Sequence, residues 1–124
     1  MSATLAVKDI EAALFNPVSG RLDAARIAKE MGVPVTTIAG AVGRKAPGVR
    51  KSPDASSLQQ SLRRLYRIWV TLVDLYAGDR HHARVFLNAP NRNLDNHAPI
   101  EFIEHGDLTP LEMYVSAMSA RQPA

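Results

Sequence analysis

The four histidines are the residues of this chain best suited to hold a metal ion, because it contains no cysteine. His81 and His82 are adjacent, so on a helix their side chains would point about 100° apart and would not easily share one metal. His97 and His105 have no partner ligand at a short, fixed spacing. The pattern therefore favours surface histidines over a metal site.

Other catalytic patterns are missing as well. The Asp and Glu residues are scattered, without a close pair in an apolar segment that would suit general acid–base catalysis. No serine sits in a strand-turn-helix elbow, and no glycine-rich loop follows a strand to hold phosphate. The sequence predicts no catalytic residue, no metal and no cofactor, and hence a protein that is not an enzyme.

Charge is distributed unevenly along the chain. Residues 1–78 contain eleven Lys and Arg against six Asp and Glu, a net charge of +5, whereas residues 79–124 contain four against six, a net charge of −2. This asymmetry suggests two surfaces with different partners, although a solvated basic face explains it equally well. The basic residues cluster further as Arg44, Lys45, Arg50 and Lys51, and as Arg63, Arg64 and Arg67.

The elements that position these residues are expected to be helices, because no segment shows the sustained alternation typical of a strand. A heptad seam predicts a long helix over 56–76, which would form an intramolecular core or half of a dimer contact. Its members are Leu58, Leu62, Leu65, Trp69, Leu72 and Tyr76. Other helices are predicted at 5–15, 23–31, from Pro34, at 79–87, from Pro99 to Gly106, and from Thr109, where Thr109 and Glu112 fit a capping box.

Residues 24–41 fit the spacing of a DNA-binding helix-turn-helix unit. Ala28 would allow two helices to cross closely, Gly32 would form the turn, and Ile38 would anchor the second helix to the first. The outward positions of that second helix are expected to include Val35, Thr36, Ala39 and Gly40.

None of these outward residues can bond a base edge bidentately, so any DNA contact is expected to be made largely to phosphates. Basic side chains after the second helix suit that role because they carry little sequence information. The candidate DNA-binding residues are Thr36, Thr37, Arg44, Lys45, Arg50 and Lys51.

The segment 43–57 reads GRKAPGVRKSPDASS and indicates a linker, since it is rich in glycine, proline, serine and charge. We therefore expect a helix-turn-helix unit with a basic linker over 1–55, a connecting helix over 56–78 and a carboxy-terminal module over 79–124. The amino terminus does not read as a signal peptide, and no apolar stretch approaches the roughly 20 residues of a membrane helix. A cytoplasmic protein without membrane contact is expected.

The carboxy-terminal third has a dense order of Pro, Asn, Leu and Gly residues that exceeds what loop formation requires. The matching residues are Pro90-Asn91-Arg92, Leu94, Pro99, Phe102-Ile103 and Gly106, followed by a final helix with Met118. In this order, after a helix-turn-helix unit and a long helix, the region resembles the toxin-binding domain of the Xre/MbcA/ParS antitoxin family. The resemblance extends roughly over residues 23–121.

The resemblance implies an antitoxin of a type II toxin–antitoxin system. Its carboxy-terminal module would bind a RES-domain toxin, which consumes NAD or transfers ADP-ribose from it, and would block the active site of that toxin. The helix-turn-helix part would support a homodimer within a hetero-oligomeric complex and, in some members, repression of the operon through operator DNA. The candidate toxin-binding residues are Asn91, Arg92, Asn93, Met113, Ala117 and Arg121.

Two other functions remain compatible with the sequence. One is a helix-turn-helix transcriptional repressor without a toxin partner, whose carboxy-terminal part only dimerises. The other is a helical adaptor protein with no role on DNA. Stable binding to a neighbouring toxin would favour the antitoxin, whereas specific operator binding with a steep salt dependence would favour the repressor.

Overall fold

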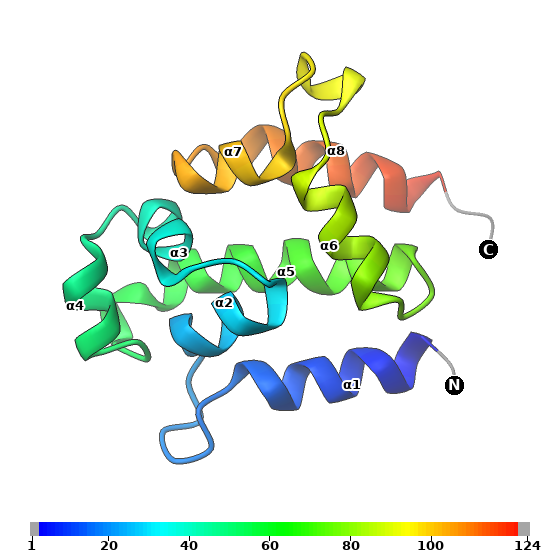
Figure 1. Cartoon of the computed structure of the whole chain (residues 1–124). Coiled ribbons are helices and arrows are strands. Elements are labelled where there is room, and N and C mark those ends of the chain that lie inside the picture. Colours follow the sequence, from blue (N-terminus) through cyan, green and yellow to red (C-terminus); the bar gives the residue numbers. More distant parts are fainter. Residues whose placement is uncertain (1–2, 122–124) are drawn as a thin grey trace.

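One long helix runs through the middle of the molecule, and the other helices pack around it (Figure 1). In the computed structural model, which describes residues 3–121, the 3-10 turn η1 (Ser56–Leu58) leads directly into α5 (Gln59–Leu75). The described residues contain two isolated bridges and no strand, so the all-α fold class is confirmed. The other elements are α1 (Ala3–Leu14), α2 (Ala24–Met31), α3 (Val35–Val42), α4 (Ala46–Lys51), α6 (Arg80–Asn88), η2 (Arg92–Leu94), α7 (Pro99–Glu104) and α8 (Leu108–Ala120).

The predicted seam of the long helix lies inside the molecule. Leu58, Leu62, Leu65, Trp69 and Leu72 are all buried, and α5 packs against α1, α2, α3, α6 and α8. The seam therefore serves an intramolecular core. Its last predicted member differs, because Tyr76 lies just beyond the helix and is 38% exposed. Within residues 3–121, no helix is both long and apolar enough to cross a membrane.

Local signals position α2 and α6 as the sequence predicts. The Asp23 carboxylate accepts a hydrogen bond from the Arg26 backbone N–H at 3.0 Å, and Gly32 ends α2 in the left-handed conformation with φ +72°. Asp79 caps α6 by accepting from the His82 backbone N–H at 3.1 Å. These caps satisfy backbone groups that a helix end otherwise leaves unpaired.

The predicted linker over 43–57 contains a short helix, α4, in its first half. This helix begins with Ala46 and Pro47, where the missing N–H of proline has no helical partner to lose. Val49 is its one buried residue and joins the hydrophobic core. A single apolar anchor leaves no periodicity in the sequence, so the helix could not be predicted from the pattern.

The three predicted segments share one hydrophobic core. α3 packs closely against α7, and α8 packs equally closely against α5. Buried residues from all three segments belong to a single cluster, which includes Ile38, Trp69 and Ile103. The first 55 residues are therefore in direct contact with the carboxy-terminal module through α3. The side chains of residues 3–7, Leu5 among them, and residues 1–2 and 122–124 lie outside what the structure describes.

The buried carboxylate of Glu30 ties α2 to two other helices. Its Oε2 accepts a hydrogen bond from the Trp69 indole N–H at 3.1 Å and lies 3.2 Å from Nε of Arg80. The Glu30 backbone carbonyl accepts two hydrogen bonds from the Arg84 guanidinium, at 2.9 and 2.7 Å. The charge is thus compensated at a site where its side chain is only 8% exposed.

The predicted capping box at Thr109 and Glu112 is wrong. α8 begins one residue earlier, at Leu108, and has no side-chain cap. Both residues bind Arg64 of α5 instead. Glu112 accepts from the guanidinium at 3.1 and 2.5 Å, and the Thr109 hydroxyl accepts from it at 3.1 Å. This bidentate contact holds α8 against α5 and raises the pKa of Arg64 chiefly through the Glu112 hydrogen bond.

Candidate functional site

The loop that follows α6 is built around Asn91. The Asn91 side-chain oxygen accepts from the Asn93 backbone N–H at 2.9 Å and so starts η2. Its backbone carbonyl accepts from the Asn96 N–H at 2.9 Å, and its N–H donates to the His97 carbonyl at 3.1 Å. Asp95 and Asn96 take left-handed conformations, which Asn and Asp tolerate better than most residues. Asn91 is therefore primarily a turn-forming residue, and Arg92 and Asn93 are left exposed.

Tyr114 of α8 attaches this loop to the final helix. Its hydroxyl accepts from the side-chain amides of Asn93 at 3.1 Å and Asn91 at 3.4 Å. The Tyr114 ring stacks on Phe86 of α6, with centroids 6.2 Å apart and an angle of 20° between the planes. Phe86 also contacts the Tyr76 ring at 6.3 Å. The predicted loop residues and the predicted residues of α8 therefore belong to one continuous surface.

The outward face of α8 is nearly free of charge. Met113 is 68% exposed, and Ala117 and Arg121 follow at intervals of four, which places the three on one side of the helix. A surface helix normally carries charged residues on its outer face, and the cores of protein interfaces are depleted of charge. The exposed residues of α8 are Thr109, Pro110, Met113, Ser116, Ala117, Ser119 and Ala120, with the first exposed charge at Arg121.

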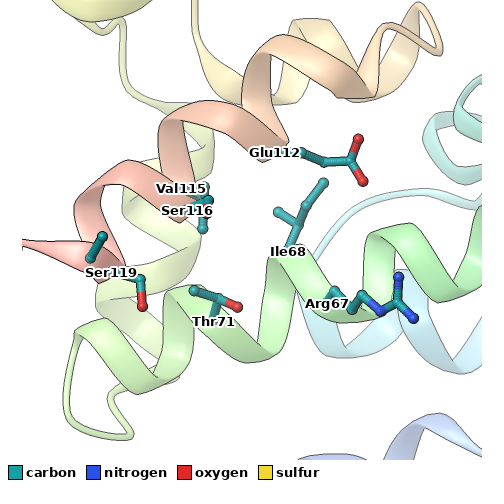
Figure 2. A pocket seen from close by; sticks show the side chains of 8 residues that line it. Arg67, Ile68, Thr71, Glu112, Val115, Ser116 and Ser119 are labelled. Atoms are coloured by element: carbon teal, nitrogen blue, oxygen red, sulfur yellow. The ribbon is translucent and has the colours of Figure 1, made fainter.

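A groove between α5 and α8 adjoins this face, and Arg67 and Glu112 contribute charged side chains to its lining. The groove has a volume of about 470 Å³. Figure 2 shows Ile68 and Val115 between the two helices, with the hydroxyl residues Thr71, Ser116 and Ser119 along the same groove. Such a surface accepts apolar side chains and offers hydroxyl groups for hydrogen bonding.

Three aromatic residues of this region were not predicted as site residues. Tyr114 and Phe86 are half-buried, and Tyr76 was predicted to be core. Burial and the nearby Tyr114 raise the pKa of Tyr76, in agreement with the proximity of the two rings. The chain has only three tyrosines, and two of them lie here. Residues far apart in the sequence come together here, so no local pattern could have identified them, although aromatic residues are enriched in interfaces.

The two ends of the candidate toxin-binding set are well separated. Arg121 lies roughly 12 Å along the helix axis from Met113, because each residue adds about 1.5 Å. At that end Arg121 lines a cavity of about 300 Å³ together with Leu75, Tyr76 and Met118. The structure thus joins Asn91 and Asn93 to α8 directly and places Arg121 at the far end of the same helix.

The candidate DNA-binding residues do not form one site. Thr37 is 3% exposed, so its side chain is not at the surface as a DNA contact would require. Ala39, predicted to face outward, is buried, and Gly40 faces α7 instead of solvent. Of the two threonines only Thr36 is exposed. The basic residues are all exposed, on α4 and the turn before it: Arg44, Lys45, Arg50 and Lys51.

α7 packs on α3 through close backbone contacts at Gly40 in α3 and at Gly106, which follows α7. A Cβ at Gly40 would overlap the Glu104 carbonyl oxygen and would lie 2.9 Å from the carbonyl carbon. From the other side, a Cβ at Gly106 would lie 3.0 Å from the Gly40 carbonyl oxygen. Only glycine permits helices to approach this closely. α7 therefore occupies the side of α3 that base reading would require.

All four histidines are exposed, as predicted. His82 binds the Asp79 carboxylate, and this hydrogen bond lowers the pKa of Asp79. His97 lies 3.4 Å from Glu101. Among residues with described side chains, no group of three or more His, Asp or Glu is placed to hold a metal ion.

No known protein family, curated protein or solved structure matches the chain. Evidence about its function therefore comes from the sequence and from the surfaces described above. The most distinctive of these is the uncharged face of α8 with the adjoining Asn loop.

Proposed function

We propose that this chain is the antitoxin of a type II toxin–antitoxin system and that it inhibits a RES-domain toxin by covering its active site. The observation that carries the proposal is the outward face of α8, where Met113 is exposed beside small uncharged residues. This face lies in the region whose motif resembles the toxin-binding domain of Xre/MbcA/ParS antitoxins. The same chain has no residue pattern suited to catalysis of its own.

The proposed contact has an apolar centre and a polar edge. Met113 and Ala117 form the centre, where a flexible thioether adapts to the shape of the partner. Arg92 and Asn93 form the edge on the loop side, and Arg121 forms it at the other end. Arginine is suited to this position because its guanidinium binds carboxylate or phosphate groups bidentately. A carboxylate in the active site of the toxin would be a suitable partner for these arginines.

The alternative function, a repressor that reads an operator through a helix-turn-helix unit, has less support. A recognition helix must enter the major groove and present polar side chains to base edges. Here α3 is covered by α7 and exposes only Thr36 among its candidate DNA-binding residues. A homodimer within the toxin complex remains part of the antitoxin proposal.

Co-expression with the product of the neighbouring open reading frame tests the proposal. A double substitution, Met113→Arg with Ala117→Arg, should abolish co-purification and the relief of toxicity, because it places two charges at the centre of the contact. Val18→Arg is the matched control, since Val18 is 96% exposed at the turn after α1. Neutralisation by the double variant at the wild-type level, or equal loss in the control, would contradict the proposed surface.

A further inference from the structure

We propose that α4 and the turn before it form a surface that binds the phosphate backbone of duplex DNA without reading its sequence. The surface consists of Arg44 and Lys45 in the turn and Arg50 and Lys51 in the last turn of α4. All four side chains are exposed, and α4 is the helix that the sequence pattern did not reveal. This inference goes beyond toxin binding and does not depend on it.

No acidic residue interrupts this surface along the chain, because residues 31–53 contain neither Asp nor Glu. The carboxylates on the adjoining elements are already engaged. Asp23 caps α2, and Glu30 is buried against Trp69 and two arginines. Asp54 lies 3.6 Å from Arg21. The four cations are therefore uncompensated, and each is available to displace a counterion from a phosphate.

The chemistry of the surface favours a duplex over other polyanions. Membrane-surface helices bury large apolar side chains, whereas the exposed residues of α4 other than the cations are Pro47 and Gly48. Single-stranded nucleic acid is bound by stacking on exposed aromatic rings. Phe15 and Tyr66 pack on each other, and Trp69 is fully buried. A duplex backbone requires only cations at the surface.

The covering of α3 explains why binding would be independent of sequence. α7 occupies the side of α3 that would approach base edges, and its last residue, Glu104, adds an exposed carboxylate there. That charge repels phosphates next to α3. DNA would thus be held by contacts that position a protein without specifying bases.

Fluorescence anisotropy with a labelled duplex, measured from about 50 to about 200 mM NaCl, tests the proposal. Each phosphate contact contributes about 0.9 to the slope of log affinity against log salt, so four contacts predict roughly a 100-fold loss of affinity over this range. The variant Arg44→Ala, Lys45→Ala, Arg50→Ala, Lys51→Ala should lose about 3.6 units of slope. Two unrelated duplex sequences should bind equally.

Paired variants separate a local effect from a change in net charge. Arg50→Ala with Lys51→Ala should reduce the slope by about 1.8, whereas Arg63→Ala with Arg67→Ala on α5 should leave it unchanged. Circular dichroism confirms that each variant is folded. The absence of duplex binding at low salt, an unchanged slope in the quadruple variant, or more than a tenfold preference for one sequence would overturn the proposal. Tighter binding to single-stranded RNA or to anionic vesicles would also overturn it.

The quadruple variant also distinguishes this proposal from the proposed function. It leaves Met113 and the Asn loop untouched, so it should still co-purify with the toxin. A chain that binds toxin but not DNA refutes only the α4 surface, and a chain that binds DNA but not toxin refutes only the antitoxin function.

Discussion

Of the two surfaces that the sequence predicts for binding, one is covered by another helix and the other is exposed to solvent. The outward side of α3, expected to face DNA, is pressed against α7 through Gly40. The outward side of α8, expected to face a protein, is left open with Met113 exposed. A helical pattern therefore predicts which residues share a face, but it does not predict whether another part of the chain covers that face.

The covered surface depends most strongly on Gly40, so Gly40→Ala should have the largest effect. The new methyl group would overlap the Glu104 carbonyl, and backbone cannot yield as a flexible side chain does. We expect the free energy of unfolding to fall by about 3 kcal/mol, as measured by urea denaturation.

Gly48→Ala is the matched control for Gly40→Ala. Gly48 lies in α4 with no atom near the position of an added Cβ. Alanine there should stabilise the protein by about 0.5 kcal/mol, because it favours the helix more than glycine does. Equal effects at the two positions would show that α3 and α7 are not in close contact.

The next largest effect is expected at the junction between the two regions. Glu30→Ala removes the acceptor of the buried Trp69 indole N–H and the partner of Arg80. The free energy of unfolding should fall by about 2 kcal/mol, because the buried Trp69 N–H would be desolvated without a hydrogen bond to offset that cost. Urea denaturation followed by Trp69 fluorescence measures it directly.

Glu30→Gln separates the hydrogen bond from the charge at that junction. Its side-chain oxygen can still accept from Trp69, so a smaller loss is expected, of about 1 kcal/mol. If both variants were as stable as wild type, the junction would not depend on this side chain.

Arg64 of α5 binds α8 through Thr109 and Glu112. Arg64→Ala should therefore lower the free energy of unfolding by about 1 kcal/mol. This is near the upper end for a partly exposed ion pair, because the contact is bidentate and includes Thr109. Arg63→Ala removes an exposed arginine next to Arg64 in sequence and should change stability little. Thermal unfolding of the two variants side by side gives the comparison.

Local features of both regions could be predicted from the sequence. The Asp23 cap, the Gly32 turn and the buried seam of α5 each depend on residues close together in the chain. Helix capping and apolar periodicity are physical properties of a short segment, so they hold before tertiary structure is known. The Asn loop was placed correctly for the same reason, since Asn91 bonds its own neighbours.

The failures share a different physical origin. Thr109 and Glu112 satisfy the pattern of a capping box, but Arg64, more than forty residues away in sequence, binds both. Gly40 was expected to face outward from its helix, whereas in the structure it lets α7 pack closely against α3. Each of these outcomes is decided by a partner distant in the chain, which no local pattern contains.

The smallest effect concerns the cap of α7, the helix that covers α3. Glu101 accepts a hydrogen bond from the Ala98 backbone N–H at 2.7 Å, and this bond, with that of His97, lowers the pKa of Glu101 below its ordinary value. A lowered pKa in the folded state means that the stabilisation is present above the ordinary pKa and is lost as the pH falls through the lowered one. On acidification from neutral pH to about pH 3, wild type should therefore lose more stability than Glu101→Gln.

Asp79→Asn is the matched control, because Asp79 has a lowered pKa and caps α6, which does not cover α3. If α7 is the cover, hydrogen exchange at acidic pH should rise in α3 of the wild type relative to Glu101→Gln and should not respond to Asp79→Asn. Equal responses in α3 to both substitutions would mean that acid loosens the whole molecule and that α7 is no separate cover.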